Sequence, residues 1–111
     1  MKRGDIWTVA GGSAYAGKPR PAVIVQDDRF DANDSIVVCP LTGDLTSAPM
    51  FRLPIEPTTA NGLQASCRLM VDKVTAVPRT RLGKRVGALS RDDMKALNRA
   101  LFVFLGLSEA A

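Results

Sequence analysis

Apolar residues occur in short runs along most of the chain and at helical spacing only near its end. The runs Ala22–Gln26 and Ile36–Leu41 are largely apolar over the length of a strand. Such runs are typical of strands that are buried on both faces or that line a small barrel. The segment Asp27–Ser35 between them is polar and predicts a turn. If the two strands pair antiparallel, the beginning of the first and the end of the second meet at one end of the sheet.

Shorter patterns predict further strands, at Ile6–Ala10, Met50–Ile55, Cys67–Val71 with Lys73–Val77 (one bent strand or two), and Lys84–Leu89. Pro54 cannot donate to a ladder and therefore favours an edge strand for its segment. The loop Glu56–Gly62 ends in Asn61-Gly62, a dipeptide that signals a hairpin. The glycine-rich stretch 11–17 predicts a loop, either a plain connection or a flap over a site.

A helix is predicted to follow Ser90, which is a good N-cap, with Asp92 and Asp93 in the first turn. Its apolar positions recur with helical spacing at Met94, Leu97, Leu101 and Leu105. Gly106 ends it. Many short strands followed by one helix predict a mainly β fold, a small barrel-like sheet with the helix packed on it. The stretch 101–105 is apolar around more than one face, and a homodimer is the simplest way to cover the surplus.

Composition changes this picture little. A chain of 111 residues with 46% hydrophobic and 23% charged residues is expected to form one globular domain, 1–111. The longest apolar run, Ala100–Leu107, is too short to cross a bilayer, and no apolar segment follows Met1-Lys2-Arg3 as in a signal peptide. We therefore expect a cytoplasmic protein without membrane association. Cys39 and Cys67 lie in apolar runs and are expected to be buried and reduced.

The residue types exclude several chemistries. The chain has no histidine, so imidazole acid–base pairs and Ser-His or Cys-His nucleophiles are excluded, and a structural zinc site with two cysteines is not expected. The acidic cluster Asp27, Asp28, Asp31 and Asp34 lacks the glycine and distal glutamate of a calcium loop, so a solvated turn is favoured over a metal site. Gly11-Gly12 opens no helix, as a phosphate-binding loop would. We expect neither a metal nor a cofactor.

The chemistry that these exclusions leave is electrostatic stabilisation of an anion. Arg20 lies between Pro19 and Pro21, which favour extended backbone at the start of the first buried run, and Thr42 ends the second. A planar guanidinium donates two parallel hydrogen bonds to phosphate oxygens, and a hydroxyl beside it can orient or stabilise the same group. The net charge of +4 permits a polyanionic substrate without requiring one. From the residues alone, Arg20 as a turn arginine and Thr42 as a loop residue remain open alternatives.

Several segments, in this order and spacing, resemble the MazF/PemK toxins, namely 2–7 (KRGDIW), 19–26 (PRPAVIVQ), 40–42 (PLT), Leu89-Ser90 and 105–107 (LGL). The resemblance spans nearly the whole chain. It implies a small SH3-like barrel of the CcdB/PemK type. It also implies a catalytic pair, Arg20 and Thr42, with Ser13 as a loose counterpart of a loop serine used by some members.

Other substrate contacts are predicted from residue type. Tyr15 in the loop and Phe30 in the turn are expected to be exposed and available for stacking on RNA bases, whereas Trp7 and Phe51 are expected in the core. Cations that could touch backbone phosphates are Lys18, Arg79 and Arg81. For each of these residues, a solvated surface position is an open alternative.

The resemblance implies the toxin of a type II toxin–antitoxin pair. Such a toxin is a metal-independent, sequence-selective endoribonuclease that cuts single-stranded RNA to a 2′,3′-cyclic phosphate and a 5′-hydroxyl. It also implies a homodimer and a cognate antitoxin with a disordered, acidic tail. Two alternatives remain. One is a CcdB-like gyrase poison, although no tryptophan follows Trp7 near the end of the chain. The other is a degenerate toxin that only binds antitoxin or nucleic acid.

Overall fold

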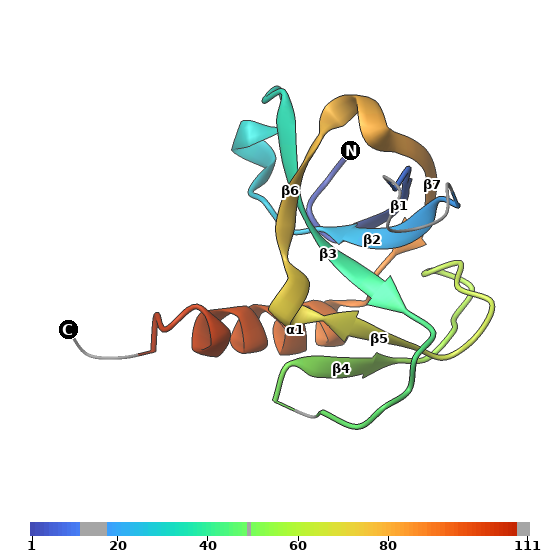
Figure 1. Cartoon of the computed structure of the whole chain (residues 1–111), viewed down its shortest axis with the longest axis vertical. Coiled ribbons are helices and arrows are strands. Elements are labelled where there is room, and N and C mark those ends of the chain that lie inside the picture. The colour runs from blue at the N-terminus through green and yellow to red at the C-terminus, as the bar shows by residue number, and fades with distance from the viewer. Residues whose placement is uncertain (12–17, 49, 109–111) are drawn as a thin grey trace.

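The computed structural model describes residues 1–11, 18–48 and 50–108. In these ranges the chain forms seven strands and one C-terminal helix, joined in part by short 3-10 turns (Figure 1). The strands are β1 (Asp5–Val9), β2 (Arg20–Ile24), β3 (Ser35–Thr42), β4 (Arg52–Ile55), β5 (Cys67–Met70), β6 (Thr75–Pro78) and β7 (Leu82–Ala88). The helix is α1 (Arg91–Phe104), and the 3-10 turns are η2 (Asp28–Phe30), η3 (Val71–Lys73) and η4 (Arg79–Arg81). The predicted mainly β fold with a C-terminal helix is confirmed.

The sheet is antiparallel throughout and runs in the order β4-β5-β3-β2-β1-β7, with β6 also paired to β3. Strand β3 is the hub, because β2 pairs along one edge while β6 and β5 share the other. It connects the half of the sheet that contains β1, β2 and β7 with the half that contains β4 and β5, beside α1 (Figure 1). The two candidate segments 67–71 and 73–77 are two strands, separated by η3.

Two clusters of buried apolar side chains form the hydrophobic core. The larger contains Ile6, Val23, Leu41, Leu69 and Leu97, and it joins α1 to both halves. The smaller lies around Ile36 and Val38, with Trp7 packed against it. Both cysteines are free. Cys39 is fully buried, as predicted, and its burial raises its pKa to about 12, whereas Cys67 is only half-buried.

Helix α1 begins and ends as the sequence predicts. The Ser90 hydroxyl accepts a hydrogen bond from the backbone N–H of Asp93 at 3.1 Å. Leu97 is fully buried on the inner face. Gly106 has a φ of +77° and its N–H donates to Val103 O, while the next N–H, of Leu107, donates to Phe102 O. These two bonds form a Schellman cap, which requires the left-handed conformation that glycine adopts most readily.

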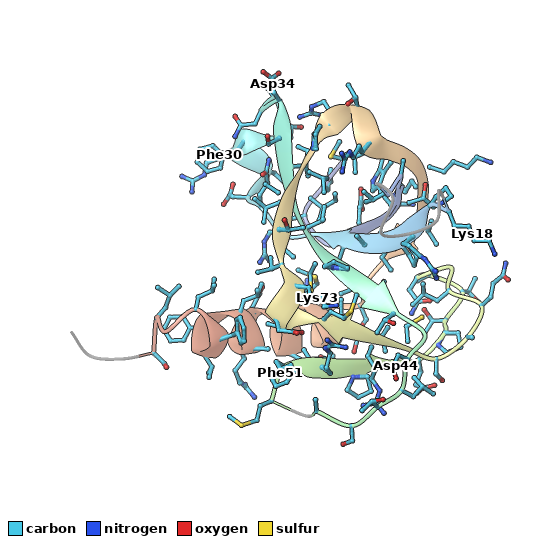
Figure 2. All side chains as sticks on the ribbon, viewed as in Figure 1. Lys18, Phe30, Asp34, Asp44, Phe51 and Lys73 are labelled. Carbon is cyan, nitrogen blue, oxygen red and sulfur yellow. The ribbon has the colours of Figure 1, made fainter. Side chains whose placement is uncertain are left out.

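The prediction of a core position for Phe51 is wrong. The residue is 36% exposed (Figure 2). Its ring makes a tilted contact with that of Phe104 of α1, with 6.4 Å between the ring centroids. The strand pattern placed Phe51 inside β4, but that strand begins one residue later, at Arg52. Phe51 therefore belongs to an apolar surface together with exposed residues at the end of α1, namely Phe102, Val103, Phe104, Leu105 and Leu107.

The hairpin that Asn61-Gly62 signals is formed by β4 and β5, which pair antiparallel, but these two residues lie within a longer loop and organise it. Asn61 is 1% exposed. Its amide accepts from the N–H groups of Thr58 and Leu63 and donates to Glu56 O. Gly62 has a φ of +69°, and a Cβ on it would lie 2.2 Å from the carbonyl oxygen of Val86. The side-chain amide thus replaces the ladder bonds that a two-residue turn would have made.

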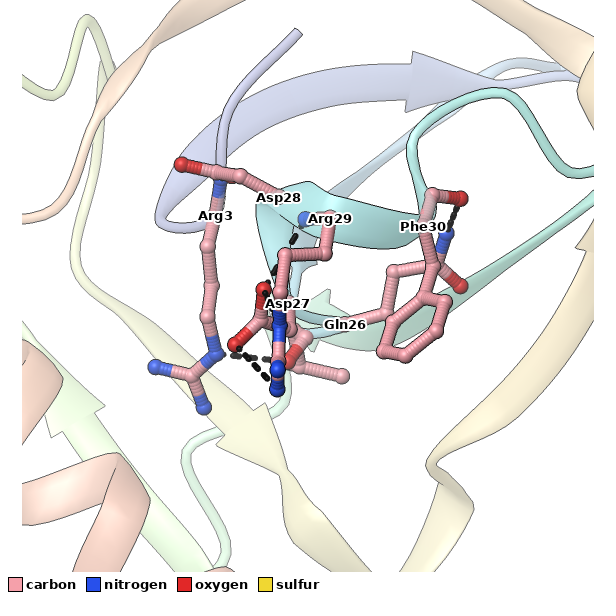
Figure 3. Close-up of polar contacts among 7 residues, drawn as sticks. Arg3, Gln26, Asp27, Asp28, Arg29 and Phe30 are labelled. Atoms are coloured by element: carbon pink, nitrogen blue, oxygen red, sulfur yellow. Dashed lines mark hydrogen bonds and ion pairs between the residues drawn. The ribbon is translucent and has the colours of Figure 1, made fainter.

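Arg3 ties the N-terminus to three parts of the fold. Its Nε donates to Val25 O at 2.6 Å, and its backbone N–H donates to Asp28 Oδ1 (Figure 3). Its Nη2 donates to Asn98 Oδ1 of α1 at 2.7 Å. Next to it, the Asp27 carboxylate caps η2 by accepting from Arg29, and these bonds lower the pKa of Asp27. Carboxylates of the acidic cluster are therefore used to build the turn.

Within the described residues, no helix combines the length and the apolar character needed to cross a membrane.

Replacing Asn61 by alanine tests its role in the loop. Asn61→Ala leaves the N–H groups of Thr58 and Leu63 and the carbonyl of Glu56 without their side-chain partner, so we expect the free energy of unfolding to fall by about 1–3 kcal/mol. Chemical denaturation followed by circular dichroism measures it. The matched control is Asn33→Ala, whose side chain is exposed, with an expected change within about 0.5 kcal/mol. Equal changes in the two variants would contradict the role assigned to Asn61.

Candidate functional site

The antiparallel pairing of β2 and β3 brings Arg20 and Thr42 to the same end of the sheet, as the sequence predicts. The register pairs Ala22 with Pro40 and Ile24 with Val38. Continued by two residues, it places Arg20 opposite Thr42. Both residues line one pocket of about 210 Å³, whose other lining residues are Pro40, Leu41, Met70 and Lys73. A guanidinium and a hydroxyl from two neighbouring strands thus open into the same space.

Arg20 has no carboxylate partner in the described part of the chain. The ion pairs there are Arg29–Asp27, Arg52–Asp72 and Arg85–Asp5, and none involves Arg20. Arg20 is exposed and is the first residue of β2, directly after Pro19. A guanidinium that is held by a strand and not neutralised by a neighbour can donate its fork of N–H groups to an external anion.

Local hydrogen bonds orient the Thr42 hydroxyl. Its Oγ1 accepts from the backbone N–H of Asp44 at 3.1 Å, and Asp44 Oδ1 accepts from the N–H and hydroxyl of Thr46 at 3.0 and 2.6 Å. The bonds from Thr46 lower the pKa of Asp44. Because the hydroxyl oxygen already accepts from the backbone, its own proton remains available to donate. Thr42 is thus suited to donate a hydrogen bond to an oxyanion in the pocket.

Lys73 also lines this pocket, and sequence analysis missed it. It is the last residue of η3, between β5 and β6, within a segment that the apolar pattern predicted as strand. The available signal was the polar pair Asp72-Lys73, which interrupts the two apolar runs. Pocket residues that lie far apart in sequence come together here because β5 pairs with the end of β3.

A half-buried ion pair anchors η3. Arg52 donates from Nε to Asp72 Oδ1 at 2.8 Å and from Nη2 to Asp72 Oδ2 at 3.2 Å. These side chains are 18% and 25% exposed. The hydrogen bonds from Arg52 lower the pKa of Asp72, and the same contact raises the pKa of Arg52. Beside the pair, the buried Val71 donates its N–H to Phe51 O at 2.9 Å.

A second, more apolar cavity of about 50 Å³ adjoins the first, and Arg20 and Pro40 belong to the walls of both. Arg81, one of the predicted phosphate contacts, lies in its wall. The remaining lining residues come from β1, β2, β3 and β6 and from the residues after β1, namely Val9, Ala10, Gly11, Pro21, Ala22, Val38, Thr75 and Val77. A flat apolar group beside the anion site could enter this cavity.

The other predicted contacts divide between the two ends of the β2–β3 hairpin. Lys18 is exposed two residues before Arg20, at the end where the pocket lies (Figure 2). Phe30 is 51% exposed at the opposite end, with the Arg29 guanidinium 5.5 Å from its ring centroid. Arg79 belongs to that end too, because its Nε donates to Asn33 O. The structure thus does not bring these two residues to the pocket. Ser13 and Tyr15 lie outside the described residues.

Metal-ligating side chains do not gather in the described ranges. No three residues among His, Cys, Asp and Glu lie close enough there to hold a metal ion. The groups that do meet at the pocket are a guanidinium, an ammonium and a hydroxyl. All three donate hydrogen bonds to anions, so the pocket is suited to bind and stabilise a phosphate group.

Comparison with known proteins identifies the family of this chain. Residues 2–105 match the family model described as "PemK-like, MazF-like toxin of type II toxin-antitoxin system". The chain is 56% identical over 108 residues to a probable endoribonuclease MazF of Mycolicibacterium smegmatis, covering 97% of this chain and 99% of the relative. It is 32% identical over 117 residues to the endoribonuclease MazF9 of Mycobacterium tuberculosis, covering 96% and 98%.

The fold also matches solved structures. One is an endoribonuclease in complex with its cognate antitoxin from a mycobacterial species. The two chains superpose with a TM-score of 0.81 at 21% identity, over 99% of each. At this level of identity the similarity shows the fold, which is the CcdB/PemK-type barrel that the sequence predicts.

Removing Arg52 tests the anchoring of η3. The pKa of Asp72 in the folded protein is depressed, so its stabilising contribution is full above the ordinary aspartate pKa of about 4 and is lost as the pH falls through the depressed value. We expect Arg52→Met to lower the Tm by a few degrees at pH 7, and the difference from the wild type to shrink below about pH 4.

Thermal unfolding at several pH values measures this difference. The matched control is Arg29→Met, which removes the exposed Arg29–Asp27 pair, with side chains 78% and 51% exposed. Exposed ion pairs contribute little to the free energy of unfolding, so the Tm of Arg29→Met should hardly differ from that of the wild type. A Tm difference for Arg52→Met that stays constant from pH 7 to pH 2 would show that the pair is not its cause.

Proposed function

The chain belongs to the PemK-like, MazF-like toxins of type II toxin–antitoxin systems, and we propose that it is an endoribonuclease that cleaves single-stranded RNA. One observation carries the proposal beyond family membership. The guanidinium of Arg20, which has no carboxylate partner among the described residues, and the oriented hydroxyl of Thr42 open into one pocket that is also lined by Lys73. Such a pocket fits the phosphodiester of RNA.

The proposed reaction uses a nucleophile that RNA itself supplies. The 2′-oxygen forms a bond to the adjacent phosphorus while the bond from phosphorus to the 5′-oxygen breaks. The 2′-hydroxyl loses its proton, the 5′-oxygen gains one, and the products are a 2′,3′-cyclic phosphate and a 5′-hydroxyl. The enzyme has to align the nucleophile and stabilise the negative charge that builds on the phosphorane oxygens.

Arg20 and Thr42 divide this work. The Arg20 fork neutralises two phosphorane oxygens and fixes their plane. The Thr42 hydroxyl donates a hydrogen bond to an oxygen of the same phosphorane. Its proton is available for this bond because Thr42 Oγ1 already accepts from the N–H of Asp44. A guanidinium is a poor general base, so Arg20 acts chiefly by charge and orientation. No step requires a metal or a cofactor.

The rest of the proposal concerns substrate and partners. Single-stranded RNA can place a splayed base in the apolar cavity next to Arg20, and sequence selectivity would follow from such contacts. We propose that Lys18 and Arg81 touch backbone phosphates and that Ser13 and Tyr15 contact substrate from their loop. Phe30 and Arg79 could take part only through RNA that extends to the far end of the hairpin.

We further propose a homodimer and an antitoxin. The exposed apolar residues at the end of α1, with Phe51 beside them, require cover, and a second copy of the single domain 1–111 is the simplest one. A cognate antitoxin with a disordered acidic tail would complement the cations of the pocket. We propose messenger RNA as the single-stranded substrate and therefore place the protein in the cytoplasm.

The variant Arg20→Ala tests the assignment of the guanidinium. Loss of a preorganised donor to a developing oxyanion costs about a hundredfold to a thousandfold in rate, so cleavage of a long RNA should fall by at least about a hundredfold. Growth arrest on expression should disappear as well. Mapping the cut ends by primer extension, with a test for the cyclic phosphate, measures both rate and chemistry.

Controls separate chemistry from folding. Arg29→Ala removes an exposed arginine at the far end of the hairpin and should cleave RNA like the wild type. The circular dichroism spectrum of Arg20→Ala should match that of the wild type. Normal RNA cleavage by Arg20→Ala would contradict the catalytic role assigned to Arg20. A wild type that binds RNA without cutting it would indicate a degenerate toxin, and poisoning of gyrase without RNA cleavage would indicate a CcdB-like protein.

Independence from metal ions is a separate prediction. Because the pocket presents cations and a hydroxyl in place of metal ligands, cleavage should persist in excess EDTA at the rate seen without it. The measurement is the initial rate of RNA cleavage with and without chelator at constant ionic strength. A loss of activity that added Mg²⁺ or Mn²⁺ restores would contradict the metal-free mechanism.

A further inference from the structure

Lys73 lines the same pocket as Arg20, but the sequence analysis assigned it no role. It is exposed (Figure 2), and it is a lining residue of the pocket together with Arg20 and Thr42. None of the ion pairs in the described ranges includes it. A lysine on a surface is usually no more than a solvated charge. Two features of its surroundings distinguish this one.

The first feature is a backbone that is fixed at the pocket. Val71 is fully buried, and its N–H donates to Phe51 O at 2.9 Å. Val74 closes the turn by donating its N–H to Val71 O. The strands on both sides of η3 pair with β3, which carries Thr42 at its end. The Cα of Lys73 is thus held in a constant position relative to Thr42, although its side chain can move.

The second feature is the state of its neighbour Asp72. A carboxylate adjacent to a lysine is a natural competitor for the ammonium, and it would also repel an incoming phosphate. Here both oxygens of Asp72 are bound by Arg52, at 2.8 and 3.2 Å. Arg52 in turn lies over the Phe51 ring, 5.9 Å from its centroid. Both oxygens of the Asp72 carboxylate are therefore occupied by Arg52, and its negative charge is compensated.

We propose that Lys73 is a second phosphate-binding residue of this site and that Arg52, by engaging Asp72, is the positioning residue that keeps Lys73 available to RNA. The proposal rests on the proposed nuclease function. An ammonium on a flexible stem binds phosphate as a point charge, whereas the Arg20 fork fixes a plane. Lys73 is therefore assigned to a phosphate next to the scissile one, where it contributes to binding and little to the chemical step.

Replacement of Lys73 gives a distinctive kinetic result. With a short fluorogenic RNA that contains one mapped cleavage site, Lys73→Met should raise KM about 5- to 20-fold while kcat stays within about twofold, as expected for an interaction made equally in ground and transition states. Because each phosphate contact to a single strand contributes about 0.7 to the slope of log affinity against log salt, the slope should become less negative by about that amount.

Two comparisons sharpen this measurement. Lys73→Arg keeps the positive charge and should restore most of the affinity. Lys95→Met removes an equal charge from the exposed face of α1 and should change neither KM nor the slope. An unchanged KM and slope for Lys73→Met, or a loss shared equally by Lys95→Met, would overturn the phosphate contact.

The role of Arg52 requires a readout that loss of stability would not move. Arg52→Met should raise KM as Lys73→Met does, and the double variant should be no worse than either single variant. Adding Asp72→Asn to Arg52→Met removes the competing charge, so KM should fall back toward the wild-type value. Additive effects in the Arg52→Met/Lys73→Met pair, or no recovery with Asp72→Asn, would contradict positioning through Asp72.

Failure of this proposal can be told apart from failure of the proposed function. If Arg20→Ala is inactive but Lys73→Met has wild-type KM and slope, the nuclease assignment stands and only the second contact is wrong. If the wild type cuts no RNA, the same salt slopes are measured by fluorescence anisotropy with a labelled single-stranded oligonucleotide. A slope that Lys73→Met leaves unchanged in that assay overturns the contact as well.

Discussion

The pairing register of β2 with β3 is the constraint on which the site depends. A shift by one residue would turn every side chain of β2 to the other face of the sheet, so the buried Val23 and Ile24 fix the register by their packing. Arg20 and Thr42 lie just beyond the last of the paired residues. The core thus sets the distance between a guanidinium and a hydroxyl that never enter it.

The segment KRGDIW near the N-terminus, which contributes to the family resemblance, has a structural role in this chain. Arg3 holds the exit of β2, the η2 turn and helix α1 at once. Gly4, with a φ of +93°, exchanges backbone bonds with Ile24 and Leu89, and Asp5 pairs with Arg85. These contacts join both ends of the chain. A motif can thus identify a family through residues that hold the fold and lie away from its chemistry.

The pocket illustrates a division of labour among cations. Arg20 is carried by a strand and is suited to oriented binding of one group, whereas Lys73 is the last residue of a short turn and offers a mobile charge. Between Lys73 and the apolar end of α1 lies a chain of contacts from Asp72 through Arg52 and Phe51 to Phe104. The same residues that anchor the turn therefore border the surface that a second subunit would cover.

Local patterns in the sequence determined the strands, the limits of the helix and the meeting of Arg20 with Thr42, because a hairpin between adjacent runs needs only short-range information. Tertiary pairing decided the rest. Lys73 reaches the pocket only because β5 pairs with the far end of β3, and Asn61 is buried because its loop packs against β7. Phe30 lies at the other end of the hairpin because it belongs to the local turn between β2 and β3, whereas Arg79 lies there because β6 pairs with the beginning of β3. Such contacts join segments far apart in sequence, and no local periodicity encodes them.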